Sequence, residues 1–238
     1  MFGAGRNRGA IARKLGEKFH VFLVDLPNHG DSPWVETLDY ESMALSVVDF
    51  VRARGIFGDA ALLGHSMGGK VGMTLALRES KALARLIVVD IAPVTYHSHS
   101  NDEIIDALLA LPLDVLKSRG EIDAALAPRI ADPMLRSYLL ANLRREGNRF
   151  VWRINLAGLR TSLPTLLDFP RFDAGVHYDA PTFFIEGARS AYIRAEDRPV
   201  IRARFPRARI EIVPEAGHWV HADAPDAVTA LVAGFMSE

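Results

Sequence analysis

Ser66 lies in a pattern that is typical of an activated nucleophile. The stretch Gly64–Gly68 reads Gly-His-Ser-Met-Gly, follows the apolar run Ala60–Leu63, and opens a helical pattern that continues to about Leu77. Such a strand-to-helix turn lifts the serine hydroxyl above a sheet, and flanking glycines let the backbone turn sharply. The amide of Met67, at the start of the helix, could stabilise a developing oxyanion. The pattern predicts that Ser66 is a nucleophile; the alternative is a glycine-rich turn with an exposed serine.

His218 is the best candidate for a base that would activate this serine. It follows the strand-like run Ile210–Val213 and lies ahead of the last helical pattern. From there it can reach the serine across one edge of a sheet. His221 is the competitor, although it suits the entry of a helix better. His65 neighbours the serine but is expected to point away from it and to pack behind the turn.

Strand-like and helical patterns alternate around these residues. Continuous apolar runs indicate buried parallel strands, and the longer segments between them have helical periodicity. From His97 to about Tyr178 the segments look helical and contain no convincing strand. We therefore expect an α/β fold with a mostly parallel sheet flanked by helices, a core formed by residues 1–97 and 181–238, and a helical cap inserted at 98–180. The expected strands are Phe19–Asp25, Ala60–Leu63, Leu86–Asp90, Thr182–Ile185 and Ile210–Val213, and the expected cap helices include Glu103–Leu111 and Met134–Leu143.

The composition is that of an ordinary globular protein. The 238 residues are 49% hydrophobic and 24% charged, and the formal net charge of -1 gives no reason to expect a nucleic-acid partner. The chain has no cysteine, which excludes disulfides and thiolate metal ligands. No apolar run approaches the roughly 18 residues of a membrane span, and no signal peptide is recognisable. We therefore expect a cytoplasmic protein without a metal or organic cofactor.

The chain resembles the α/β-hydrolase superfamily, and within it the bacterial esterases that cleave acyl esters and acyl thioesters. The resemblance implies a triad in the chain order serine, acid, histidine. It extends over nearly the whole sequence and is carried by the segments Asp25–Pro33, Gly64–Lys70, Val89–Pro93, Ile185–Tyr192 and Gly217–Ala222.

The acid of the triad is the point at which the sequence departs from much of the superfamily. Many members have Gly-x-x-Asp at this position, whereas this chain reads Gly187-Ala-Arg-Ser190. Because a serine cannot balance the charge of an imidazolium, another carboxylate is required. Asp90 is the best candidate, since it ends the neighbouring strand and the resembling esterases use an aspartate in the same Asp-Ile-Ala-Pro context. It could instead cap a turn, and Glu186 and Asp102 are the reserves.

The second oxyanion donor is a further point at which the sequence departs from the resembling esterases. The resembling esterases use a backbone amide just after a His-Gly pair, but this sequence begins Met1-Phe2-Gly3 without that pair. Met1 or Phe2 would supply the donor from a terminus that is expected to fray. The resemblance also implies early strands ahead of this point. We expect either a start internal to a longer product, which we favour, or a damaged copy. In both cases stability and activity are low, and an upstream segment ending in His-Gly restores them.

These residues predict a serine hydrolase that cleaves carboxylic esters or thioesters through an acyl-enzyme. Ser66 would attack, His218 would transfer the proton, and Asp90 would orient the imidazole. The substrate would be a small acyl ester or thioester. The expected substrate contacts are His29, Tyr96, Trp152 and Trp219, although His29 could equally order its own loop and Trp152 could belong to the cap core.

Other functions fit the same pattern. A perhydrolase or a C–C bond hydrolase would use the same triad without a cofactor. A binding protein that keeps the fold but is catalytically weak or inactive is the non-enzymatic alternative. Haloalkane and epoxide chemistry is disfavoured because it needs a carboxylate nucleophile at position 66.

Overall fold

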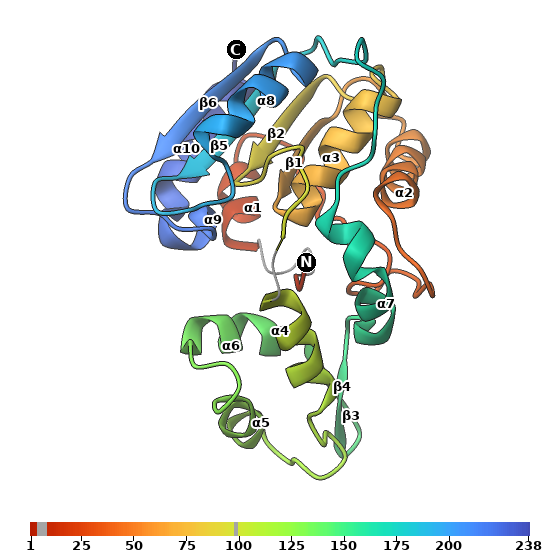
Figure 1. Ribbon diagram of the computed structural model, residues 1–238, viewed down its shortest axis with the longest axis vertical. Coiled ribbons are helices and arrows are strands. Elements are labelled where there is room, and N and C mark those ends of the chain that lie inside the picture. Colours follow the sequence, from red (N-terminus) through yellow and green to blue (C-terminus); the bar gives the residue numbers. More distant parts are fainter. Residues whose placement is uncertain (4–8, 98–99) are drawn as a thin grey trace.

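A parallel four-stranded sheet lies at the centre of the protein. The computed structural model describes residues 1–3, 9–97 and 100–238, and the sheet has the strand order β1-β2-β5-β6 (Figure 1). Every neighbouring pair in it is parallel. This confirms the expected α/β fold. The strands are β1 (Ala61–His65), β2 (Arg85–Val89), β5 (Thr182–Gly187) and β6 (Ala208–Val213).

Helices cover both faces of this sheet, and the alternation of side chains along β2 shows why. Leu86 and Val88 pack into one core with α2 (Tyr40–Ala53), α3 (Met67–Arg78) and α8 (Arg198–Arg204). Ile87 and Val89 point the other way, into a second core with α1 (Gly9–Leu15), α9 (Val220–Asp223) and α10 (Pro225–Met236). Each such fully buried side chain stabilises the fold by about 1.5–3 kcal/mol. A strand buried on both faces accounts for the continuous apolar run in the sequence.

The parallel arrangement brings the ends of all four strands to one edge of the sheet. Ser66 follows β1, Asp90 follows β2, Ser190 lies just after β5, and His218 follows β6. Residues separated by up to 152 positions in the chain are therefore positioned on adjacent loops. This edge is where α/β sheets commonly hold their ligands.

The described residues between β2 and β5 form four helices and one hairpin. This segment occupies the lower part of Figure 1, and the N-terminus of the chain lies between it and the sheet layer. Its elements are α4 (Ser100–Leu109), α5 (Arg119–Leu126), α6 (Pro133–Leu140), β3 (Leu143–Glu146), β4 (Arg149–Trp152) and α7 (Leu156–Leu167). Ser98 and His99, at which the expected cap begins, lie outside the described residues, and the division of the chain at 97/98 and 180/181 stays a prediction.

The hairpin β3–β4 corrects the expectation that this segment contains no strand. Its two strands pair antiparallel, and Gly147 at the turn has a φ of 58°, a conformation that glycine adopts without steric cost. Charged residues on the exposed face of β3 hide the strand pattern in the sequence, while Phe150 of β4 is buried. The helix expected at Met134–Leu143 is shorter in the structure. Helix α6 ends at Leu140, because the chain enters strand β3 at Leu143.

The expected strand Phe19–Asp25 is absent from the sheet that the structure describes. The segment is not helical, but none of its residues pairs in a ladder, because an apolar run becomes a strand only when a neighbouring backbone can pair with it. Strand β1 is at the edge of the sheet. The segment Phe19–Asp25 and strand β1 line an apolar cleft of about 600 Å³. Phe19 and Val21 contribute from the segment, and Leu62 and Leu63 contribute from β1.

No helix in the described ranges combines the length and apolar character that crossing a membrane requires.

Candidate active site

Ser66 occupies a sharp turn between β1 and α3. Its φ of 54° and ψ of -122° are unusual for a residue with a side chain, and such backbone strain costs about 1–3 kcal/mol. The Ser66 N–H donates to the carbonyl of Val89 at 3.0 Å, which fixes the turn to the neighbouring strand. Gly64 permits the tight geometry, since a Cβ at that position would lie 2.1 Å from the Gly68 carbonyl oxygen. The turn holds the serine side chain at the carboxyl edge of the sheet.

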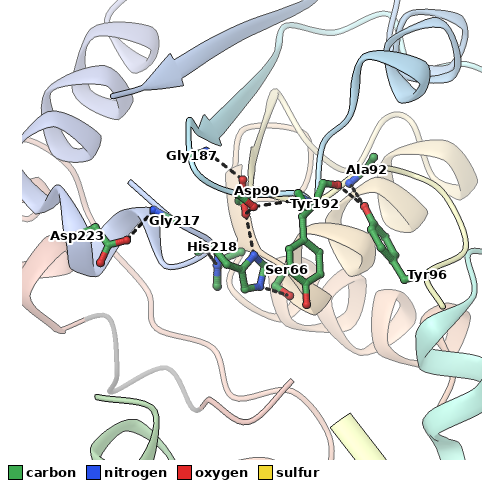
Figure 2. A network of polar contacts seen from close by, with 12 residues as sticks. Ser66, Asp90, Ala92, Tyr96, Gly187, Tyr192, Gly217, His218 and Asp223 are labelled. Carbon is green, nitrogen blue, oxygen red and sulfur yellow. Dashed lines mark hydrogen bonds and ion pairs between the residues drawn. The ribbon is translucent and has the colours of Figure 1, made fainter. Parts of the chain in front are cut away.

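The imidazole of His218 bridges Ser66 and Asp90 (Figure 2). Its Nε2 lies 3.1 Å from Ser66 Oγ, and its Nδ1 lies 2.7 Å from Asp90 Oδ2. With the Nδ1 proton donated to the carboxylate, Nε2 is left as an acceptor that faces the hydroxyl. Asp90 is fully buried and also accepts a hydrogen bond from the Gly187 N–H at 3.0 Å. The structure thus brings together three side chains that the sequence predicted to meet.

Ser190 adds a contact that sequence reasoning missed. Its hydroxyl donates to Asp90 Oδ2, the same oxygen that contacts His218, and accepts from the N–H of Tyr192 at 3.2 Å. The sequence marked Ser190 only as the position that lacks a carboxylate. The sequence feature that could have revealed this contact is a hydrogen-bonding side chain just after β5, at the position where many related proteins have their acid.

The two reserve carboxylates are occupied elsewhere. Glu186 forms an ion pair with Arg198 at 2.6 Å, and burial raises the pKa of the Glu186 carboxyl. Asp102 on α4 pairs with Arg160. Of the three candidates for the acid, Asp90 is the one that hydrogen-bonds the His218 ring in the structure.

The two neighbouring histidines pack behind this ring. Nε2 of His65 lies 2.7 Å from the backbone carbonyl oxygen of His218, and the two ring centroids are 4.8 Å apart. The ring of His221 packs edge-on against His65, with the centroids 4.6 Å apart. This is consistent with the expectation that His65 packs behind the serine. The histidine whose ring lies within hydrogen-bond distance of Ser66 is His218.

Met67 and the first two residues form the side of the site at which an oxyanion could bind. Met67 is the first residue of α3, so its N–H has no acceptor within the helix. Phe2 is buried, and its carbonyl accepts a hydrogen bond from Asn142 Nδ2 at 2.7 Å. Both Met1 and Phe2 line the same cavity as Ser66. The structure therefore holds this segment by specific contacts, which differs from the frayed terminus that the sequence suggested.

His29 is one of the residues that hold this segment, and it does not line the cavity as expected for a substrate contact. The ring is buried, with Nε2 2.6 Å from the Met1 carbonyl oxygen and Nδ1 2.9 Å from that of Pro27. Burial lowers the pKa of His29 and outweighs the two carbonyl contacts, which act in the opposite direction. The loop-ordering role, which the sequence left open, fits this position.

A cavity of about 580 Å³ opens at Ser66 and His218. Of the expected substrate contacts, Tyr96 and Trp219 line it, and His97 does so as well. Trp152 does not line it, because its side chain lies on β4 and packs against the hydrophobic core. The apolar part of the wall comes largely from α4, α6 and α7, with Ile104, Met134, Leu135 and Leu166. Among the described residues, no group of three or more His, Asp or Glu side chains could hold a metal ion.

Lys70 forms part of the same wall and is almost completely buried. Its Nζ donates to the carbonyls of Leu167 and Asp168, at 3.0 and 2.6 Å, and so connects α3 to the end of α7. Burial lowers the pKa of Lys70 to about 7. The rings of Tyr40 and Tyr96 lie 5.5 and 4.7 Å from the amine, measured to their centroids.

The parallel sheet, the strained serine turn and the bridging imidazole define a hydrolase of the α/β type. Residues 3–231 match the family model described as "Alpha/beta hydrolase family", and the chain belongs to this family.

Named relatives agree with this assignment. The chain is 37% identical over 240 residues to the sn-1-specific diacylglycerol lipase ABHD11 of Danio rerio, covering 98% of this chain and 75% of that protein. It is 34% identical to the esterase YbfF of Escherichia coli, covering 100% of this chain and 91% of the relative. A solved structure titled "Marine microorganism esterase" superimposes with a TM-score of 0.94 at 33% identity, over 99% of this chain and 92% of the other. These relatives confirm the expected resemblance and identify the protein as a carboxylic ester hydrolase.

Proposed function

We propose that this protein is a serine hydrolase that cleaves carboxylic esters or thioesters through a covalent acyl-enzyme, with Ser66, His218 and Asp90 as its triad. The observation that carries the proposal is the continuous hydrogen-bonded chain from the Ser66 hydroxyl through the imidazole to the Asp90 carboxylate. The cytoplasmic location stays a prediction.

The first half-reaction follows from this geometry. His218 Nε2 accepts the proton of Ser66 Oγ as that oxygen attacks the carbonyl carbon of the substrate. The imidazolium that forms is balanced by Asp90, whose carboxylate is buried and already hydrogen-bonded to Nδ1. His218 then protonates the leaving alcohol or thiol, and the acyl group remains on Ser66. Water repeats the sequence in the second half-reaction, with His218 again as base, and releases the carboxylic acid.

The oxyanion of each tetrahedral intermediate would be held by two backbone amides. Met67 supplies one from the start of α3, where the helix dipole also favours negative charge. The other comes from the backbone N–H of Phe2 or of the adjacent Met1, which line the same cavity as Ser66. The peptide between Met1 and Phe2 is not cis, so the Phe2 N–H points away from the carbonyl that His29 binds. His29 and Asn142 are thus positioning residues for this donor.

The cavity supports a substrate with an apolar acyl group. A volume of about 580 Å³ falls in the range of small-molecule sites, and side chains of α4, α6 and α7 give it an apolar wall beside Ser66. The named relatives act on esters, including a lipase specific for the sn-1 position of diacylglycerol. We extend the ester class, and not that lipid, to this protein.

A fluorophosphonate probe and a series of p-nitrophenyl acyl esters test the proposal. The wild-type protein should be labelled and should hydrolyse the esters, and Ser66→Ala should abolish both. Ser100→Ala is a matched control, since Ser100 lines the same cavity and has no part in the triad. A folded wild-type sample that is neither labelled nor active would reject the proposal and favour a binding protein with a hydrolase fold.

A further inference from the structure

The ring of Tyr192 lies flat against the imidazole of His218. The two centroids are 3.8 Å apart and the ring planes meet at 21°, so this is a stacked pair and not an edge contact (Figure 2). Tyr192 comes from the loop after β5 and lines the cavity beside Ser66. The edge of the imidazole is used by Ser66 and Asp90, and Tyr192 covers one of its faces.

Backbone contacts fix this tyrosine from two sides. Its N–H donates to Ser190 Oγ at 3.2 Å, and its carbonyl accepts from the Tyr96 hydroxyl at 2.5 Å. The Tyr96 hydroxyl in turn accepts from the Ala92 N–H at 2.8 Å, two residues beyond Asp90. The loop that carries the ring is therefore attached to the segment that carries the acid. These hydrogen bonds hold the backbone of Tyr192 next to the imidazole.

An aromatic ring interacts differently with the two protonation states of the histidine. The face of a phenol ring carries partial negative charge, which attracts a cation within about 6 Å and has little effect on a neutral group. Burial raises the pKa of the Tyr192 hydroxyl, so the phenol stays neutral over the working pH range. The stack thus favours the imidazolium, which exists only after the proton has left Ser66.

We propose that Tyr192 is a positioning residue that holds the His218 ring in its bridging orientation and stabilises its protonated form during ester cleavage. The inference rests on the proposed triad. Proton transfer from Ser66 Oγ to His218 Nε2 creates a positive charge directly beneath the ring face of Tyr192. Asp90 balances that charge from the Nδ1 edge, and the tyrosine does so from the face.

Other ionisable groups near His218 also affect the charge of its imidazole, so a test of Tyr192 must leave these groups unchanged. Asp90 contacts the ring from the end of β2, and His65 packs against it from β1, with His221 behind. The more distant groups are the Glu186–Arg198 pair beside Asp90, Tyr96 behind Tyr192, Asp223 bonded to the Gly217 N–H, and Arg194 on the cavity wall. Substitution of the ring alone leaves all of them in place.

The experiment measures the titration midpoint of the His218 imidazole by NMR in a Ser66→Ala background, with His218→Gln to assign the signal. Tyr192→Leu should lower the midpoint by about 0.5–1 pH unit, because it removes the stabilisation of the cation. Tyr192→Phe keeps the ring and should leave the midpoint nearly unchanged. A pentafluorophenylalanine at position 192 keeps the shape but reverses the charge of the ring face, so it should behave like Tyr192→Leu.

Ester hydrolysis provides the second measurement. With Ser66 present, Tyr192→Leu should shift the acid limb of the kcat/KM profile to lower pH and reduce kcat about 3- to 10-fold, and Tyr192→Phe should restore both. Equal midpoints for Tyr192, Tyr192→Leu and the fluorinated ring would overturn the proposal. If no variant hydrolyses an ester, the proposed function fails, but the NMR titration still decides whether the stack stabilises the cation.

Discussion

The hydroxyl of Ser190 donates to Oδ2 of Asp90, the oxygen that also contacts the imidazole of His218. Together with the N–H of Gly187 on Oδ1, this contact satisfies a carboxylate that is fully removed from solvent. A buried charge is tolerated only when it is paired and hydrogen-bonded in this way. Asp90 is therefore preorganised to face the histidine before any substrate binds.

The acid assignment leads to the first prediction. Asp90→Asn should lower kcat by about 10³- to 10⁴-fold, because an amide cannot balance the imidazolium and favours the wrong tautomer of His218. Steady-state hydrolysis of a p-nitrophenyl ester measures this effect. Asp102→Asn is the matched control, since this reserve carboxylate pairs with Arg160 on the cap side, and it should leave kcat within about twofold. Near-normal turnover by Asp90→Asn would reject Asp90 as the acid.

The contact between Asn142 and the Phe2 carbonyl leads to the second prediction. Asn142→Ala removes a side chain that holds the Phe2 carbonyl, as His29 holds that of Met1, so the second oxyanion donor loses part of its fixed position. Complete loss of such a donor costs about 10²- to 10³-fold in kcat, and a loosened donor should cost part of this. KM should change little, because the oxyanion forms only along the reaction path. A rise in KM at unchanged kcat would instead make Asn142 part of the substrate site.

Amide hydrogen exchange gives the third prediction. The amides of residues 20–24 have no backbone acceptor in the described structure, whereas those of Ile87 and Val88 lie in a strand paired on both sides. We expect residues 20–24 to exchange nearly as fast as an unfolded peptide and the two β2 amides to exchange orders of magnitude more slowly. Mass spectrometry of peptic fragments distinguishes the two regions. Strong protection of 20–24 would mean that a backbone partner covers this segment in solution.

The sequence was sufficient to predict the residues that meet at the edge of the sheet. Ser66, Asp90 and His218 each follow an apolar run, and parallel strands bring their carboxyl ends together whatever the separation in the chain. The roles proposed for these residues stay predictions until the variants above are measured. Their contacts could be predicted because apolar runs mark where parallel strands end, and the choice of Asp90 drew in addition on the resemblance to esterases with an aspartate in the same context.

Contacts between loops could not be predicted in the same way. The stacking of Tyr192 on His218 and the hydrogen bond from Ser190 depend on the path of the loop after β5, for which no periodic pattern exists. For His29 the sequence left a substrate contact and a loop-ordering role equally open, and the structure places the buried ring against the Met1 carbonyl. The strand expected at Phe19–Asp25 failed because strand formation depends on a partner that local sequence does not specify.

The buried amine of Lys70 leads to the last prediction, which concerns stability and pH. Its pKa is lowered by burial from 10.5 to about 7, so between these values the unfolded chain binds a proton that the folded protein does not hold. The free energy of unfolding should therefore rise with pH across this window, by at most about 1.4 kcal/mol per pH unit from this group. Burial raises the pKa of Tyr178 to about 12, which acts in the opposite direction above about pH 10.

Urea unfolding at several pH values between about 7 and 9.5 isolates the contribution of Lys70. Lys70→Met keeps the length of the side chain but has no titrating group, so its free energy of unfolding should rise less steeply with pH than that of the wild type. The variant also loses the hydrogen bonds to the Leu167 and Asp168 carbonyls. This loss lowers the free energy of unfolding by a similar amount at every pH, so the difference in slope reports the titration of Lys70 alone. Parallel pH profiles for the two proteins would show that Lys70 keeps its ordinary pKa when folded. In that case its ammonium is stabilised by those two carbonyls and the adjacent rings strongly enough to offset burial.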